Sequence, residues 1–287
     1  MTRILVTGKT GQVGGELIAA LAPLGEVAAC DRQTLDLADP AAIAATVRKL
    51  RPDIIVNAAA YTAVDRAESE PELAMAINGT APGILAAEAL RLNALLVHYS
   101  TDYVFDGAKR APYEENDAPN PLNVYGRTKL VGERAVQASG AQYLILRTSW
   151  VYGAHGRNFL VTISRLAAER DELKVVDDQI GAPTWCRDIA NATGAILARR
   201  QDKAGAFNDI YNLSAQGSTS WHDFAAEILA HATARPKARL APIPTSAYPS
   251  AAARPLNSVL SHDKVKNTFG IELPDWRASL AACLTDK

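Results

Sequence analysis

The glycine-rich segment near the N-terminus restricts the fold of this chain more than any other sequence feature. It has the pattern GxxGxxG, and its glycines are Gly8, Gly11 and Gly14. A strand-like run over 4–6 precedes it, and a helical pattern over 16–21 follows it. Glycines allow a tight turn and a close approach of the backbone to a ligand, and a helix N-terminus binds anions. This order of elements predicts a site for the pyrophosphate of a dinucleotide.

A P-loop is the competing interpretation, because it also joins a strand to a helix through glycines. A P-loop needs Lys followed by Ser or Thr after its last glycine, whereas Gly14 is followed by Gly15 and Glu16. The lysine that would reach the β- and γ-phosphates is therefore missing. We set this interpretation aside.

Apolar runs alternate with helical patterns from residue 3 to about 200. The runs rich in Val, Ile, Leu and Ala lie at 4–6, 27–29, 54–56, 95–97 and 144–146. Asp39-Pro40 and Glu70-Pro71 are start signals for helices that extend to Leu50 and to about Leu92. Strands that are apolar on both faces and separated by helices predict an α/β fold, a Rossmann-type doubly wound parallel sheet. Ligands then gather at the carboxyl ends of the strands.

The alternation weakens after about residue 205, where the chain becomes rich in Pro and Ala. We expect a small mixed C-terminal substrate lobe there. The predicted NAD(P)-binding domain comprises 1–150 plus about 186–205, and the smaller lobe comprises 151–185 and 206–287.

Charge and composition argue against several classes of function. The net charge is −1 over 287 residues, so we expect no basic face for nucleic acid. Cys30, Cys186 and Cys283 are widely spaced and lack a CxxC pair, so they predict neither a disulfide framework nor a zinc site. The sequence has no signal-peptide pattern at its start and no apolar stretch approaching about 20 residues. We expect a soluble, cytoplasmic protein with no membrane partner.

Asp31 bears on the choice of cofactor. It follows the second predicted strand, 31 − 14 = 17 residues after the last glycine, where a carboxylate binds the adenine ribose. Asp31 favours NADH by repelling a 2′-phosphate, but the adjacent Arg32 would admit NADPH. The cofactor is therefore NADPH or NADH. The alternative interpretation is that Asp31 is a polar residue at the end of a strand and does not bind the cofactor. After the third strand, the small residues from Asn57 to Thr62 would either let a cofactor approach or pack beneath a helix.

Tyr125 and Lys129 are four residues apart on a predicted helix, so they share one face. A carbonyl that receives hydride needs a proton, and a tyrosine supplies one near neutral pH only if a cation lowers its pKa. We expect Lys129 to be that cation and to bind the nicotinamide ribose. Thr101 follows the fourth strand, and its hydroxyl would contact the substrate oxygen and orient Tyr125. A YxxxK pattern alone is usually a pair on the surface of a helix. The dinucleotide-binding pattern upstream favours a catalytic interpretation here.

These residues resemble those of the extended short-chain dehydrogenase/reductase superfamily and, within it, the dTDP-4-dehydrorhamnose reductase family. The resemblance covers essentially the whole chain. The superfamily shares the glycine pattern and YxxxK, whereas the tail over 244–249 and 254–258 is the narrower signal. Other matching segments are 8–14, 51–60, 63–68, 98–105, 121–126 and 147–153.

The resemblance implies an NAD(P)H-dependent oxidoreductase that reduces the C4 ketone of dTDP-4-dehydro-6-deoxy-L-mannose to dTDP-L-rhamnose, the last step of dTDP-rhamnose biosynthesis. It implies that Tyr125 is the proton donor, Lys129 its electrostatic partner and Thr101 the tuning hydroxyl. The residues that it places at the cofactor, together with the glycines, are Gln12, Val13, Asp31, Ala60, Tyr61, Thr62, Tyr99, Tyr125 and Lys129. It places the sugar nucleotide against Thr101, Asp102 and Trp150.

Trp150 and Arg254 are also candidate substrate contacts on their own chemistry. Trp150 ends the fifth predicted strand, where it would stack on a sugar or base unless it is a core residue. Arg254 would clamp a diphosphate through bidentate contacts unless it is a surface charge. Relatives often have two arginines before the proline of the tail, and Ala253 occupies the first of these positions here.

The resemblance leaves magnesium and a homodimer open. Some relatives dimerise through acidic residues that hold Mg²⁺, and Glu16 matches one ligand while the others are unmatched. We therefore assign no metal site. The nucleotide sugar is the expected small-molecule partner.

Two other functions are compatible with the same motifs. A nucleotide-sugar epimerase or dehydratase would retain its NAD. A dehydratase needs two carboxylates directly after Thr101, but here Asp102 is followed by Tyr103, which argues against a dehydratase. A non-catalytic regulatory subunit would keep the fold and lose turnover. The presence of Thr101, Tyr125 and Lys129 argues against it.

Overall fold

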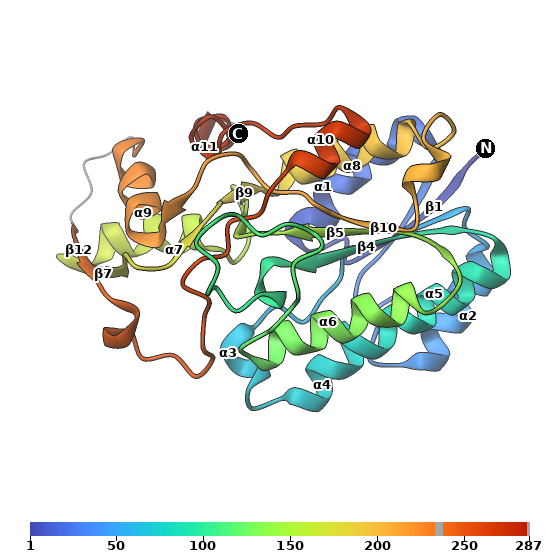
Figure 1. Ribbon diagram of the computed structural model, residues 1–287, viewed down its shortest axis with the longest axis horizontal. Helices are drawn as coiled ribbons and strands as arrows, with labels where there is room; N and C mark the ends of the chain where they lie inside the picture. Colours follow the sequence, from blue (N-terminus) through green and yellow to red (C-terminus); the bar gives the residue numbers. More distant parts are fainter. Residues whose placement is uncertain (233–237, 286–287) are drawn as a thin grey trace.

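A six-stranded parallel sheet forms the centre of the molecule (Figure 1), with strand order β10-β5-β4-β3-β1-β2. This computed structural model describes residues 1–232 and 238–285. The strands are β1 (Arg3–Thr7), β2 (Glu26–Cys30), β3 (Ile54–Asn57), β4 (Leu95–Thr101), β5 (Gln142–Thr148) and β10 (Asp209–Asn212). The predicted parallel sheet and its first five strands are confirmed. The order reverses between β1 and β3, so a crevice for ligands is expected at their carboxyl ends.

Helices cover both faces of this sheet. Figure 1 shows α1 (Gln12–Leu21), α8 (Cys186–Ala198) and α10 (Asp263–Phe269) on one side, and α2 (Pro40–Leu50), α5 (Ala81–Leu92) and α6 (Val124–Gln137) on the other. Because side chains alternate along a strand, Ile4 and Val6 enter the first core while Leu5 enters the second. The doubly wound architecture predicted from the apolar runs is confirmed.

Two helix starts follow the predicted signals. The Asp39 side chain accepts hydrogen bonds from two N–H groups of the first turn of α2. The helix that begins at Pro71 comprises α4 (Pro71–Met75), the π-turn η2 (Ala76–Thr80) and α5. Over Pro71–Leu92 it is long and apolar enough to cross a membrane, but half of that window is buried inside the protein. It packs against α2 and α6, as a core helix does.

A smaller lobe lies at one end of the sheet (Figure 1). Its core combines α7 (Phe159–Glu169), α9 (Trp221–Ala230) and α11 (Trp276–Thr285) with the parallel pair β7 (Glu172–Val176) and β12 (Arg239–Ile243). Two further strand pairs complete it: β6 (Val151–Tyr152) with β9 (Thr184–Trp185), and β8 (Ile180–Gly181) with β11 (Thr219–Ser220). Parallel and antiparallel pairs occur together, so the predicted mixed character of the lobe is confirmed.

The chain returns to the sheet after residue 206, which the sequence did not indicate. We expected 206–287 to lie in the lobe, yet β10 pairs with β5, and α10 contributes Val265 and Phe269 to the core of the first face. A four-residue edge strand carries too little periodicity to be recognised. The division into two domains stays a prediction, and its residues 233–237 and 286–287 lie outside the described residues.

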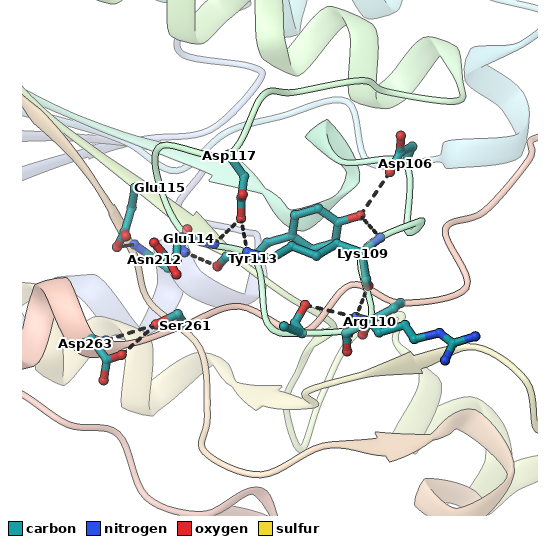
Figure 2. A network of polar contacts seen from close by, with 12 residues as sticks. Asp106, Lys109, Arg110, Tyr113, Glu114, Glu115, Asp117, Asn212, Ser261 and Asp263 are labelled. Atoms are coloured by element: carbon teal, nitrogen blue, oxygen red, sulfur yellow. Dashed lines mark hydrogen bonds and ion pairs between the residues drawn. The ribbon is translucent and has the colours of Figure 1, made fainter.

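The loop before α6 is tied to the C-terminal tail. The Tyr113 N–H donates to the Val259 carbonyl at 2.7 Å, and the Ser261 N–H donates to the Tyr113 carbonyl at 2.8 Å. Figure 2 shows the Tyr113 hydroxyl between Asp106 and Lys109, where it donates to Asp106 Oδ1 at 3.0 Å. These contacts hold the tail beside the carboxyl end of β4.

Candidate active site

The glycine turn is as tight as its pattern predicts. Gly8 has φ +77°, and a Cβ there would lie 2.9 Å from the backbone of Ala59, which follows β3. A Cβ on Gly14 would lie 2.0 Å from the Gly8 carbonyl oxygen. Gly11 is the N-cap of α1 and offers no side-chain cap, so backbone N–H groups of the first turn, which contains Gln12 and Val13, remain for a ligand.

Asp31 lies beside this turn, directly after β2. Its carboxylate pairs with Lys9 Nζ at 3.1 Å and accepts hydrogen bonds from Thr34. The Lys9 contact, followed by those of Thr34, lowers the pKa of Asp31 to about 2, so the carboxylate is ionised under ordinary conditions. Arg32 is exposed and lies 3.7 Å from Asp36. Lys9, which the sequence-based interpretation did not consider, therefore offsets the negative charge that would repel a 2′-phosphate.

The segment after β3 is fixed by Asn78. Its Oδ1 accepts the Tyr61 N–H at 2.8 Å, and its Nδ2 donates to the Tyr61 carbonyl at 3.0 Å and to Thr128 Oγ1 at 3.2 Å. The Tyr61 hydroxyl donates to Glu70 at 2.6 Å. Asn78 thus joins the predicted cofactor segment, including Ala60 and the exposed Thr62, to α6. An Asn within an otherwise apolar helical pattern was the available signal for it.

Tyr125 lies in the first turn of α6, close to Thr101. Asn123 caps this helix by accepting the Gly126 N–H at 2.8 Å. A Cβ on Gly126 would lie 2.2 Å from the Tyr103 carbonyl oxygen, so the first turn packs tightly on η3 (Asp102–Val104). This approach brings the Tyr125 hydroxyl near Thr101, which acts on the pKa of Tyr125. The fold therefore brings Tyr125 of the YxxxK pattern next to Thr101 at the end of β4.

The pKa of Tyr125 differs from the sequence-based expectation. Burial raises the pKa of Tyr125 to about 12; the Thr101 hydroxyl opposes that shift, and the charge of Asp102 adds to it. Burial lowers the pKa of Lys129 to about 8. Lys129 Nζ donates to the Tyr99 carbonyl at 2.5 Å. The expected lowering of the Tyr125 pKa by Lys129 does not appear: burial sets the direction of the shift, and Lys129 is not among the groups that act on Tyr125.

Asp102 is enclosed by hydroxyl groups. The Thr101 hydroxyl donates to its Oδ1 at 2.9 Å and the Ser149 hydroxyl to its Oδ2 at 2.9 Å, while Ser258 of the tail also binds it. Burial nevertheless raises the pKa of Asp102 to about 6. We expected this carboxylate to touch the substrate. Its oxygens hold together the end of β4, the end of β5 and the tail, and its contact with the substrate stays a prediction.

Tyr99 reaches the site only through its backbone. Its side chain is buried, and its hydroxyl lies 2.6 Å from the Thr193 hydroxyl of α8. Its carbonyl oxygen is the acceptor for Lys129. The phenol is therefore part of the core behind the predicted cofactor position.

Trp150 lies just after β5 with φ +46°, in the left-handed region. Its ring is stacked on Trp221, with centroids 3.5 Å apart and an interplanar angle of 3°. On Gly181 a Cβ would lie 2.3 Å from the Trp150 ring, so that glycine is needed for the ring to fit. The sequence did not indicate Trp221, which lines a cavity of about 530 Å³ in the lobe.

Arg254 lines the same cavity, together with Tyr248 and Lys174. Its guanidinium forms two hydrogen bonds with Asp65, at 2.6 and 3.1 Å. The neighbouring Ala253 accepts a hydrogen bond from the Asn123 side chain through its carbonyl oxygen, at 2.8 Å. The tail therefore bridges the lobe and the start of α6.

The Glu16 carboxylate accepts a hydrogen bond from Arg187 Nε at 2.9 Å. Over 1–232 and 238–285, no group of three or more His, Cys, Asp or Glu side chains could hold a metal ion. The three cysteines are buried and form no disulfide among the described residues.

Comparisons with known proteins cover the full length of the chain. The family model described as RmlD substrate binding domain matches residues 1–287. A dTDP-4-dehydrorhamnose reductase of Burkholderia thailandensis is 52% identical, over 99% of this chain and 98% of its own length. The Escherichia coli K12 protein of the same name is 48% identical, over 99% of this chain and 97% of its own length.

Solved structures are similar to this chain over its full length as well. The crystal structure of dTDP-4-dehydrorhamnose reductase from Bacillus anthracis in complex with NADP has a TM-score of 0.91 and 36% identity, with 100% of both chains covered. Structures of nucleotide-sugar enzymes at 18% identity, such as a dTDP-glucose 4,6-dehydratase from Streptomyces venezuelae, share only the fold.

Proposed function

The chain belongs to the RmlD substrate binding domain family, and we propose that it acts as a dTDP-4-dehydrorhamnose reductase. It reduces the C4 ketone of dTDP-4-dehydro-6-deoxy-L-mannose to dTDP-L-rhamnose, using NADPH or NADH. Full-length relatives at 52% and 48% identity carry this name. A relative at 36% identity was crystallised with NADP. The protein is accordingly an oxidoreductase of dTDP-rhamnose biosynthesis.

The residues at the carboxyl ends of β1 and β3 fit a dinucleotide. Gly8 and Gly14 allow a turn so tight that a Cβ at either position would collide with backbone, and the first turn of α1 has no side-chain cap. Asp31 and Lys9 lie where the adenine ribose would be bound, with one negative and one positive charge. The bound cofactor supplies a hydride for C4. Lys129, which donates a hydrogen bond to the Tyr99 carbonyl, is the residue that we assign to binding the nicotinamide ribose.

The observation that carries the proposal is the convergence of three side chains: Thr101 ends β4, and Tyr125 and the buried Lys129 lie four residues apart on α6, with Thr101 close enough to lower the pKa of Tyr125. The Thr101 hydroxyl donates to Asp102 Oδ1 at 2.9 Å and also acts on the Tyr125 hydroxyl, whose pKa it lowers, so Thr101 links Asp102 to Tyr125. Tyr125 is the group that we assign as proton donor to the C4 oxygen. Its raised pKa keeps the phenol protonated until an alkoxide develops.

The lobe supplies the sugar-nucleotide contacts in this proposal. The cavity of about 530 Å³ combines the aromatic Trp221 with the cations Arg254 and Lys174. An aromatic ring suits a base and guanidinium suits a diphosphate. Trp150 positions Trp221 by stacking on it. Trp221 covers one face of the Trp150 ring, and Gly181 packs against the same Trp150 ring.

A homodimer and a cytoplasmic location are further parts of the proposal. The buried thiols, which form no disulfide among the described residues, suit a reducing compartment. Size-exclusion chromatography with and without EDTA tests whether a dimer forms and whether it needs Mg²⁺.

The decisive experiment is an assay of NADPH oxidation with the dTDP-4-keto sugar. Wild type should turn over the substrate, and Tyr125→Phe should lose about 10²–10⁴-fold in kcat with its cofactor affinity kept. Tyr143→Phe, on β5, is the matched control. Absence of turnover by the wild type would refute the proposal, and so would full activity of Tyr125→Phe.

A further inference from the structure

A row of buried polar side chains leads from Lys129 towards the glycine turn. Lys129 Nζ lies 3.5 Å from His98 Nε2, and His98 Nδ1 lies 3.0 Å from Asn57 Nδ2. Asn57 Oδ1 accepts the Thr7 hydroxyl at 2.7 Å. The register of the sheet creates the row, because Thr7 pairs with Asn57 and Asn57 pairs with His98 on three adjacent strands. All four side chains are nearly inaccessible to solvent.

The hydrogen bonds of this Thr7–Asn57–His98 row have a fixed direction. Thr7 Oγ1 accepts the Ala59 N–H at 3.2 Å and donates its single proton to Asn57 Oδ1 at 2.7 Å. The Asn57 amide then presents Nδ2 to His98. A ring nitrogen that accepts a hydrogen bond carries no proton. The proton of the neutral His98 ring is therefore on Nε2, which faces Lys129.

An N–H directed at a lysine nitrogen opposes the ammonium form, because both groups are donors. The neutral amine has a lone pair that accepts from this N–H. We infer that His98 is a positioning residue for Lys129: its Nε2–H, oriented by Asn57 and Thr7, favours the uncharged amine and so sets the pH at which Lys129 changes charge.

The surrounding charges agree with this assignment. Burial, and then the charge of Lys129, lowers the pKa of His98 well below its usual value, so the ring stays neutral. Burial lowers the pKa of Lys129, and Glu133 on the same helix opposes that shift. Glu133 is itself paired with Arg147 of β5 at 2.7 Å. Within the described residues, Glu133 is the charged group that acts on Lys129.

The inference rests on the proposed function only for its kinetic consequence. If Lys129 must be charged for reduction, the activity falls as the pH rises through its pKa. Weakening the row should raise that pKa and move the alkaline limb of the kcat profile to higher pH. The ionisation of Lys129 itself can be followed without substrate.

The first measurement is the ¹⁵N NMR spectrum of the histidine rings, which distinguishes the two tautomers. The chain has five histidines, so replacing each of the other four assigns His98 without a change in the row. The Nε2–H form is expected. An Nδ1–H form would overturn the inference.

The second measurement compares Thr7→Val with Thr193→Val by titrating the ¹³Cε signal of Lys129. Both variants remove one buried hydroxyl, but Thr193 binds the Tyr99 hydroxyl and lies outside the row. Thr7→Val should raise the pKa of Lys129 by about half a unit or more, with the kcat profile moving equally, and Thr193→Val should not. An unchanged pKa in Thr7→Val, or equal shifts in both, would contradict the role of the row. Lack of turnover on the sugar nucleotide would refute the proposed function and leave this titration intact.

Discussion

Arg254 and Asp65 form a bidentate ion pair between positions 189 residues apart, with Nη2 of Arg254 2.6 Å from Oδ2 of Asp65. Asp65 belongs to α3 (Val64–Ala67), which follows the predicted cofactor segment, and Arg254 belongs to the tail. The pair holds the guanidinium at the wall of the cavity of about 530 Å³. It therefore connects the two regions that we assign to cofactor and sugar nucleotide.

Arg254→Lys should raise the KM for the sugar nucleotide about tenfold, with kcat changed less, because an ammonium cannot contact both Asp65 and a phosphate in the guanidinium geometry. Steady-state kinetics measure this. Arg239→Lys is the control, since Arg239 forms an exposed pair with Glu172 in the same lobe. An unchanged KM in Arg254→Lys would exclude Arg254 from substrate binding.

Asp102 should make the protein less stable as the pH rises from about 4 to 6. Its folded-state pKa is raised from 3.8 to about 6, so the folded state binds the proton more tightly than the unfolded state in this window. The free energy of unfolding contributed by this group falls by about 2–3 kcal/mol across the window and is constant above it. Asp102→Asn should remove that component, as the difference between urea unfolding curves of the two proteins. Equal pH slopes would contradict the prediction.

Gly14→Ala should weaken cofactor binding, because its Cβ would lie 2.0 Å from the Gly8 carbonyl oxygen and would displace the turn. We expect at least about a tenfold rise in the Kd for NADPH, measured by fluorescence titration. Gly15→Ala is the matched control. Its Cβ would lie 3.4 Å from the Lys9 carbonyl, and alanine improves helix propensity by up to about 1 kcal/mol. Equal affinities in the two variants would place the pyrophosphate elsewhere.

Lys9→Met should shift the cofactor preference towards NADH. Lys9 neutralises Asp31 at 3.1 Å, and its loss leaves a carboxylate that repels a 2′-phosphate. The KM for NADPH should rise about five- to tenfold more than the KM for NADH, and added salt should reduce the difference. Lys49→Met, on the exposed side of α2, controls for the loss of one surface charge. A parallel change in both KM values would show that Lys9 does not discriminate the cofactors.

Local patterns in the sequence were sufficient for the strand–helix alternation and for the glycine turn. The five apolar runs became β1 to β5, and the start signals Asp39-Pro40 and Glu70-Pro71 began helices where expected. Each of these signals lies within a few residues of the element that it predicts, so backbone propensity and burial act on the same short segment. The spacing of Tyr125 and Lys129 likewise fixed a common helix.

Contacts between distant segments were decided only by the tertiary structure. The return of β10 and α10 to the sheet, the stacking of Trp150 on Trp221 and the pairing of Arg254 with Asp65 depend on side chains that no local period relates. The pKa of Tyr125 followed the same rule, since burial by neighbouring elements, and not the helix neighbour four residues away, sets the direction of its shift. The sequence by itself thus determined the elements and the residue types of the site. The fold decided which of these groups touch, which are charged and in which direction their protons point, because those properties depend on register and burial.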